Sequence, residues 1–228
     1  MTALWLSRVR LRQAAPVAAL ARLLVPEEGG AQKVAAHRLV WALFADGPER
    51  QRDFLWRQER PGEFLALSTR PPNPLDDLFS IESKPFEPVL TEGDRLAFRL
   101  HANPVVARKT TAAGRGQRHD VVMDALHRLP PGAGRAEARP DAVVQAGRAW
   151  LARQGEAHGF RPEGDVAVDG YETLRLARED GRPIRFGVLD FEGVLRVTDP
   201  GRFLAALAQG FGRARAFGCG LMLIRRAV

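Results

Sequence analysis

The sequence has little cysteine, lysine and tyrosine, and it lacks any long apolar run. Its single cysteine, Cys219, excludes a disulfide within the chain and a zinc site built from several cysteines, so we interpret it as a packing residue. No stretch approaches the ~18 apolar residues of a membrane span, and the apolar run at residues 3–6 is too short for a signal peptide. These absences predict a protein of the reducing cytoplasm with no membrane partner.

The charged side chains have a clear excess of one sign. Lysine and arginine together number 34, against 27 acidic residues, which gives a formal net charge of +7. Such a balance favours a polyanionic partner, either nucleic acid or an anionic membrane surface. An arginine-rich, lysine-poor composition is also typical of a G+C-rich coding sequence. We therefore rely on where the arginines stand in the chain and not on their number.

Glycine is concentrated near the C-terminus, in the segment that we call the glycine loop, residues 210–220. One interpretation is a phosphate-holding loop, because backbone N–H groups without side chains around them can bind an anion and arginine adds forked donors. The other is a connection that lets a helix reverse into the last strand. No Walker A or dinucleotide-binding spacing is present. The residues of this candidate anion site are Gly210, Gly212, Arg213, Arg215, Gly218 and Gly220.

The hydrophobic pattern predicts the same order of elements twice. In the first half we expect a strand at 3–12, helices at 16–24 and 31–44, strands at 54–58 and 63–69, a short helix at 75–79 and a strand at 95–101. In the second half we expect strands at 105–111 and 117–123, a helix at 141–157 capped by Asp141, strands at 166–177 and 184–198, a helix at 200–207 capped by Asp199, and a final strand.

This order predicts an α+β fold made of two successive βαββαβ units, a tandem ferredoxin-like (RRM-like) architecture. We place the two domains at residues 1–103 and 104–228. Each unit packs two helices on one face of an antiparallel sheet, and RNA-recognition modules use the opposite face. The aromatic pattern by which such modules stack RNA bases is missing here.

His37 is the residue of the first half that best suits catalysis. It lies at the edge of the apolar arc of the predicted helix 31–44, where a lone histidine is more often a packed, hydrogen-bonded residue than a catalyst. Lys33 lies one turn earlier on the same side, where it would lower the pKa of His37 or face the same anion. The five histidines show no metal-ligand spacing, so we expect no metal.

Short blocks spread over nearly the whole chain resemble a known family. They lie at residues 4–11, 37–44, 52–57, 84–86, 96–104, 191–195, 199–200 and 209–221. The glycine loop and the segment from Phe98 to Pro104, Phe-Arg-Leu-His-Ala-Asn-Pro, are the most specific of them. Together these blocks resemble the CasE (Cse3) endoribonucleases, which process CRISPR repeat RNA in the type I-E Cascade system.

The resemblance implies a tandem ferredoxin-like fold and a ribonuclease that needs neither metal nor cofactor. It implies cleavage at the base of the repeat hairpin, with attack of a 2′-hydroxyl on the adjacent phosphate to leave a 2′,3′-cyclic phosphate and a 5′-hydroxyl. It further implies that the product stays bound, so that each molecule turns over once. The protein then remains with the guide RNA and the other Cascade subunits.

The family's catalytic histidine matches His37, which would act as general base or general acid. Family members carry a tyrosine three residues earlier, where this chain has Val34. Either another group, with Lys33 as first candidate, assists His37, or this member cleaves slowly. The rival hypothesis is therefore a cleavage-deficient subunit that binds the hairpin. His101 stands where the family usually has arginine, and we interpret it as a surface substitution.

Binding of the RNA is expected to rest on basic side chains, most of them in the second half. A-form RNA is held mainly through its phosphates and its shape, so a charged turn near residues 178–183 is expected to grip the hairpin stem, although any single arginine is more often just solvated. A nucleotide-phosphate enzyme is disfavoured, because no Walker or Rossmann context surrounds the glycine loop. The candidate RNA-binding residues outside that loop are Arg38, Arg108, Lys109, Arg115, Arg118, Arg175, Arg178, Arg182 and Arg185.

Overall fold

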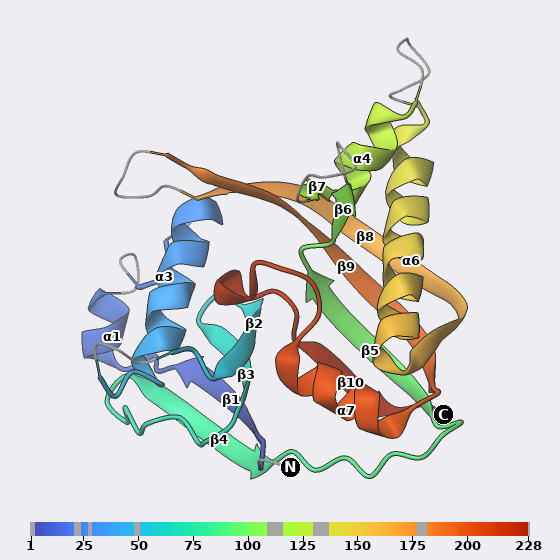
Figure 1. Cartoon of the computed structure of the whole chain (residues 1–228). Coiled ribbons are helices and arrows are strands. Elements are labelled where there is room, and N and C mark those ends of the chain that lie inside the picture. The colour runs from blue at the N-terminus through green and yellow to red at the C-terminus, as the bar shows by residue number, and fades with distance from the viewer. Residues whose placement is uncertain are drawn as a thin grey trace.

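The computed structural model describes residues 3–20, 24–26, 29–47, 51–108, 116–129, 137–176 and 182–227. Within them the chain forms two four-stranded antiparallel sheets and one two-stranded ribbon (Figure 1). We call the first sheet with its helices the first unit and the second sheet with its helices the second unit. No helix in these ranges is long and apolar enough to span a membrane.

The first unit has its helices on one face of the sheet. In spatial order its strands are β2 (Phe54–Arg60), β3 (Glu63–Ser68), β1 (Trp5–Leu11) and β4 (Phe79–Pro85), and its helices are α1 (Ala15–Ala19) and α3 (Gly29–Ala42). Side chains of β1 alternate, so that Val9 enters the core beneath α3. Arg8 and Arg10 point to the other face, where both lie within 4 Å of Glu63. The basic side chains on this face of β1 are therefore partly neutralised by ion pairs.

The second unit repeats the strand order. Its strands are β10 (Met222–Arg226), β5 (Arg95–Ala102), β9 (Ile184–Val197) and β8 (Phe160–Leu176), and its helices are α4 (Val121–His127), α6 (Arg139–His158) and α7 (Pro200–Gln209). The ribbon is β6 (Val105–Arg108) with β7 (Gln117–Asp120). Leu96, Phe98 and Leu100 alternate along β5 and are buried in the core that this sheet shares with α6 and α7. The tandem ferredoxin-like fold is confirmed, because each sheet has the order fourth, first, third, second strand of its own unit.

The predicted boundary at residues 103 and 104 is wrong, because the strand assigned to the end of the first unit belongs to the second. β5 pairs with β9 and β10, and the fourth strand of the first sheet is β4, in a stretch where we predicted no strand. Of the β4 side chains only Phe79 is buried, so this edge strand has no apolar alternation to reveal it. The expected helix at 75–79 is a single turn closed by a bond from the Phe79 N–H to the Leu75 carbonyl at 2.8 Å.

Of the two predicted helix caps, Asp199 is confirmed and Asp141 is wrong. Asp199 caps α7, since its side chain accepts a bond from the Arg202 N–H at 3.0 Å. Asp141 does not cap α6, which begins two residues earlier at Arg139 and holds Asp141 in its first turn. A carboxylate there suits the positive end of the helix dipole without capping it.

The two units join through the faces of their sheets that carry no helix. Leucines of the first sheet, among them Leu6, Leu55 and Leu67, pack against Leu221 and Leu223 at the start of the last strand. The face that RNA-recognition modules leave open is therefore used, in part, to hold the units together. This packing brings the glycine loop, which precedes β10, against β2 and α3 of the first unit.

Candidate functional site

His37 lies on α3 and bonds to the glycine loop of the second unit. Its Nδ1 is 2.8 Å from the carbonyl oxygen of Ala216, in the 3₁₀ turn η1 (Arg215–Phe217). Trp56 Nε1–H of β2 donates to the same oxygen at 3.1 Å. Because a carbonyl oxygen only accepts, His37 Nδ1 carries the hydrogen in this bond. Nε2 is then the nitrogen that holds the lone pair in the neutral ring.

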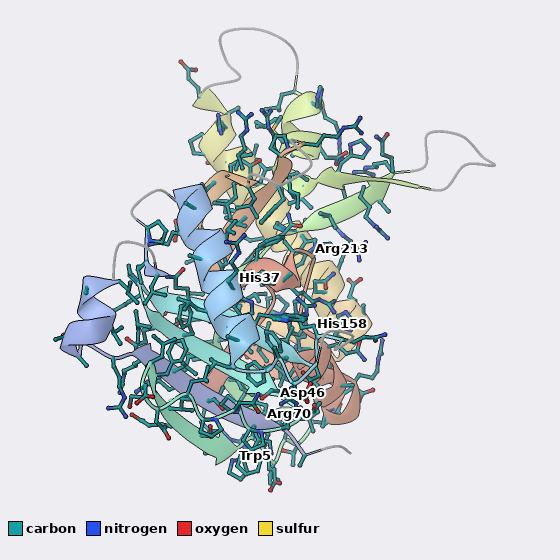
Figure 2. All side chains as sticks on the ribbon, turned by 90° about the vertical axis from the view of Figure 1, so that its left-hand side faces the viewer. Trp5, His37, Asp46, Arg70, His158 and Arg213 are labelled. Atoms are coloured by element: carbon teal, nitrogen blue, oxygen red, sulfur yellow. The ribbon has the colours of Figure 1, made fainter. Side chains whose placement is uncertain are left out.

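The surroundings of His37 are aromatic on two sides and open on a third. Its ring centroid is 5.9 Å from that of Trp41 and 5.6 Å from that of Phe217. His37, Arg38, Trp41 and Ala42 line a pocket on the surface of α3. Figure 2 shows His37 on this helix, with Arg213 and His158 on the neighbouring second unit. The half-buried imidazole is thus placed where a bound molecule reaches it.

The pKa of His37 is lowered from its ordinary value of 6.5, chiefly because burial penalises the imidazolium. The bond to Ala216 opposes this effect, and the positive charges of Arg52 and Arg38 add to it. The ring is therefore neutral near pH 7. A neutral imidazole with Nδ1–H committed to a carbonyl is suited to accept a proton at Nε2.

The glycine loop owes its glycines to close packing. Gly212 has φ +74°, and a Cβ there would lie 2.7 Å from the Asn103 carbonyl oxygen; Gly220 has φ +93°, and its Cβ would lie 2.7 Å from the Phe211 oxygen. Neither position accepts a larger side chain without displacement. These contacts explain why two of the most specific blocks in the sequence, residues 98–104 and the glycine loop, occur together.

Several amides of the glycine loop are engaged inside the protein. The N–H groups of Phe211, Arg213 and Gly220 donate to the carbonyls of Gly220, Asn103 and His101 at 2.8 to 3.1 Å. They are not available to cradle an anion, so the interpretation as a reversing connection describes the backbone better. The part of the anion-site prediction that remains is its arginines.

A cluster of arginines lies beside His37. Burial lowers the pKa of Arg52, and the charge of Arg215 lowers it further; burial and the charge of Arg213 do the same to Arg215. His158, at the end of α6, has its pKa lowered by burial and by the charges of Arg202 and Arg215. In the part of the chain that the structure describes, no acidic side chain pairs with Arg52, Arg213 or Arg215. Cations without acidic partners, of which Arg52 and Arg215 are half-buried and Arg213 is exposed, favour an anionic ligand.

Lys33 lies one turn before His37, but its charge acts elsewhere. Burial raises the pKa of Asp190 on β9, but the hydrogen bond and charge of His101 outweigh it, with smaller contributions from the charges of Arg57 and Lys33. The charges that lower the pKa of His37 belong to Arg52 and Arg38. Burial raises the pKa of the Cys219 thiol to about 12, and its side chain is fully buried. Cys219 is therefore the packing residue that its isolation in the sequence indicated.

His101 is not a surface substitution. Its side chain is only 16% exposed, and Nδ1 lies 2.9 Å from Asp190 Oδ1, its cross-strand partner on β9. The interpretation failed because position 101 lies on the outward face of β5, which the join between the units partly covers. A single sequence does not reveal that covering.

The predicted basic residues of the second unit differ in their surroundings. Arg108 is tied to Asp124 by two bonds of 3.1 and 2.8 Å, which occupy the guanidinium. Arg118 is exposed on β7. Arg175 of β8 and Arg185 of β9 are exposed cross-strand partners, and Arg182 precedes β9. Lys109, Arg115 and Arg178 lie outside the described residues.

The exposed arginine pair lies near the helix that carries His37. A Cβ at Gly30, in the first turn of α3, would be 2.7 Å from the Arg175 carbonyl oxygen. The far end of the long β8–β9 hairpin therefore reaches over the start of α3 (Figure 1). Arg38, exposed on α3, adds to this side. The catalytic candidate and the basic hairpin thus share one side of the molecule.

Three groups that the sequence did not single out complete the site. Arg52 acts on His37 by its charge, the Ala216 carbonyl accepts a hydrogen bond from His37, and Trp56 donates to that same carbonyl. Arg52 and Trp56 lie in the block at 52–57, which is one of those that resemble the family. That resemblance was the sequence signal that could have identified them as site residues. Ala216 acts through its backbone, for which a side-chain pattern holds no signal. Among the described residues, no group of three acidic, histidine or cysteine side chains is arranged to hold a metal ion.

Comparison with known proteins gives consistent matches over nearly the whole chain. A family model described as CRISPR associated protein matches residues 4–226. The chain is 31% identical over 198 residues to the CRISPR-associated endoribonuclease Cse3 of Thermus thermophilus, covering 78% of this chain and 81% of that protein. It is 29% identical over 192 residues to the CRISPR system Cascade subunit CasE of Escherichia coli, covering 82% and 88%.

A solved structure agrees with these sequence matches. Thermus thermophilus Cse3 bound to an RNA representing a pre-cleavage complex is similar to this chain with a TM-score of 0.66 and 29% identity, covering 98% of this chain and 99% of the other. The likeness therefore extends over both units and the join between them.

Proposed function

Because the chain belongs to the CRISPR associated protein family, among its CasE (Cse3) members, we propose that it is an endoribonuclease that cleaves precursor CRISPR RNA at the repeat hairpin. The observation that carries the proposal is the state of His37, a neutral imidazole with Nδ1–H held by Ala216 beside arginines that lack acidic partners among the described residues. The related proteins are named as an endoribonuclease and a Cascade subunit. After cleavage the protein stays on the guide RNA hairpin within the Cascade assembly.

The proposed reaction uses the RNA's own nucleophile. The 2′-hydroxyl oxygen attacks the adjacent phosphorus while its proton passes to Nε2 of His37. The bond from phosphorus to the 5′ oxygen breaks, and that oxygen is protonated from water, which leaves a 2′,3′-cyclic phosphate and a 5′-hydroxyl. General base catalysis of this kind contributes roughly a hundredfold to ten-thousandfold in rate. The chemistry requires neither a metal nor a cofactor.

The cations near His37 have separate roles in this proposal. Arg52 lies close enough to His37 to lower its pKa, so it stabilises negative charge that develops on the phosphorane. Arg213 and Arg215 hold neighbouring phosphates, and the glycines of the loop support them by close packing and not by direct contact with RNA. Arg38, Arg118, Arg175, Arg182 and Arg185 bind the hairpin stem, together with Lys109, Arg115 and Arg178 outside the described residues. Arg108 contributes less, because Asp124 occupies it.

The same contacts that bind the substrate also bind the product. Cleavage at the base of a hairpin leaves the stem, with most of its phosphates, on the protein. We therefore expect about one turnover per molecule, as a hydrolase of the phosphodiester-cleaving class that keeps its product.

A second function has one observation in its favour. At the position of the family tyrosine stands Val34, half-buried and without an acid or base, and the charges that lower the pKa of His37 are those of Arg52 and Arg38. A helper for His37 is therefore not evident among the side chains of α3. The alternative is a subunit that binds the repeat hairpin without cutting it.

The deciding experiment is cleavage of the cognate repeat hairpin in EDTA by the wild type and by His37→Ala, with product ends mapped and RNA affinity measured. We expect metal-free cutting to a 2′,3′-cyclic phosphate that disappears in His37→Ala while affinity remains. Tight binding without cutting by the wild type would establish the alternative function. Weak binding that is insensitive to the hairpin would reject both.

A further inference from the structure

Two side chains of the first unit donate to one carbonyl of the second. His37 Nδ1 and Trp56 Nε1 meet at the Ala216 oxygen, at 2.8 and 3.1 Å. His37 and Ala216 are 179 residues apart in sequence, and Trp56 and Ala216 are 160 apart. Trp56 is fully buried between α3 and the first sheet. The carbonyl therefore enters the first unit as a fixed acceptor next to its core.

The turn that bears this carbonyl is itself held in place. Phe217 N–H donates to the Ala214 oxygen at 2.8 Å, and Arg215 Nε–H donates to the Gly212 oxygen at 3.2 Å. Gly218 lies so close to Trp56 that a Cβ there would be 3.1 Å from the indole ring. The Phe217 ring packs against His37 on one side and Phe186 on the other, at 5.6 and 5.8 Å between centroids. The direction of the Ala216 carbonyl is thus determined by packing.

A neutral histidine has two tautomers, and in each of them only one ring nitrogen has the lone pair that accepts a proton. An accepting carbonyl at Nδ1 selects the tautomer with its hydrogen on Nδ1 and the lone pair on Nε2. We propose that Trp56 is a positioning residue, which aims the Ala216 carbonyl so that His37 keeps this tautomer and this ring orientation. Trp56 acts through the carbonyl and does not touch the RNA.

The charges around His37 make the tautomer matter at neutral pH. Arg38 on the same helix and Arg52 in the segment before β2 face the ring, while Trp41 and Phe217 add apolar surface. These neighbours and burial favour the neutral ring over the imidazolium. An imidazolium carries both hydrogens and has no tautomer to select, so the selection of a tautomer by the carbonyl matters only for the neutral ring.

The test compares Trp56→Phe with Trp150→Phe in the full chain. Trp150 is a matched control, because it is 2% exposed, belongs to the core of the second unit, and lies beside the glycine loop at Gly212. Nitrogen-15 NMR of histidine-labelled protein reports which ring nitrogen of His37 bears the hydrogen. Single-turnover cleavage and RNA affinity are measured on the same samples.

In the wild type we expect the Nδ1–H tautomer alone. In Trp56→Phe we expect a mixture of tautomers and a cleavage rate lower by about tenfold, with RNA affinity within about twofold, because a misplaced base loses part of its usual contribution. Trp150→Phe should keep the wild-type tautomer and rate. The cleavage measurements rest on the proposed function, whereas the NMR measurement holds even for a protein that does not cut.

Three results would overturn the inference. The first is an Nε2–H tautomer in the wild type, which decides the question even if Trp56→Phe does not fold. The second is an unchanged tautomer in a folded Trp56→Phe. The third is an equal loss of rate in both tryptophan variants, which would assign the effect to core packing alone. A wild type that holds the Nδ1–H tautomer but does not cleave would reject the nuclease and leave the positioning of His37 supported.

Discussion

Arg175 and Arg185 stand directly opposite each other on β8 and β9, both with exposed side chains. Like charges at such cross-strand positions destabilise a sheet by a few tenths of a kcal/mol up to ~1 kcal/mol. The repulsion between the two arginines is relieved where a polyanion binds and neutralises both charges. This pair therefore marks the end of the β8–β9 hairpin near α3 as a surface that gains from contact with phosphates.

Replacing both Arg175 and Arg185 by alanine should weaken hairpin binding about tenfold at moderate salt. Each lost phosphate contact removes up to about 0.9 from the slope of log affinity against log salt, so the slope should decrease by as much as about 1.8. The free energy of unfolding should stay constant or rise slightly, because a repulsion is removed. Titration of labelled hairpin at several salt concentrations measures the slope, and urea unfolding measures the stability.

Arg153→Ala serves as the control for that pair, since Arg153 is exposed on α6 and not on the hairpin. It should leave affinity and slope at their wild-type values. An unchanged slope in the double variant would remove the β8–β9 hairpin from the RNA-binding surface.

The pH dependence of cleavage should report the lowered pKa of His37. As a base, His37 is active in its neutral form, so the single-turnover rate should rise with pH and level off, with a midpoint below 6.5. Arg52→Gln removes a positive charge that lowers this pKa, and it should move the midpoint to higher pH.

The control for Arg52→Gln makes the same charge change nearby. Arg60 is exposed at the end of β2 and does not contribute to the pKa shift of His37. Arg60→Gln should keep the wild-type midpoint. A midpoint that Arg52→Gln moves to lower pH, or a rate that falls as pH rises, would contradict the assignment of His37 as the base.

Gly212→Ala should destabilise the protein by about 1–3 kcal/mol. The backbone at Gly212 has φ +74°, and the added Cβ would lie 2.7 Å from the Asn103 oxygen, which accepts the Arg213 N–H bond at 3.1 Å. Gly47→Ala is the matched substitution, because a Cβ there meets nothing within 4 Å. It should change the free energy of unfolding by less than about 0.5 kcal/mol, as measured by urea denaturation. Equal stability of the two variants would show that the glycine loop accommodates the added methyl group at position 212 without loss of stability.

Val34→Tyr should raise the cleavage rate of the bound hairpin, by up to about a hundredfold, if a missing phenol limits this member. Val34 is half-buried on α3, three residues before His37, so a tyrosine there enters the same side of the helix. Val34→Phe adds the ring without the hydroxyl and should give no increase. Equal rates for the two variants would indicate that this protein does not need the phenol.

Much of the fold followed from local pattern. The alternation of Leu96, Phe98 and Leu100 predicted a strand, and Asp199 followed by proline predicted the start of α7, because both signals act between neighbouring residues. The partner of each strand is a different question. β4 has only Phe79 buried, so its side chains do not identify it as a strand. It pairs with β1, which is distant in sequence, and the pattern of neighbouring residues does not encode that contact. The boundary between the units was therefore misplaced.

The candidate site divides in the same way. By itself the sequence determined the two repeated units, the helix that carries His37, the glycine loop and the family to which the chain belongs. Only the tertiary structure decided that the Ala216 carbonyl accepts from both His37 and Trp56, that the charges of Arg52 and Arg38 act on His37, and that Asp124 pairs with Arg108. Hydrophobic periodicity and helix capping depend on residues that lie within a few positions of one another in the sequence. Hydrogen bonds between segments 160 or 179 residues apart arise only when the join between the units brings them together.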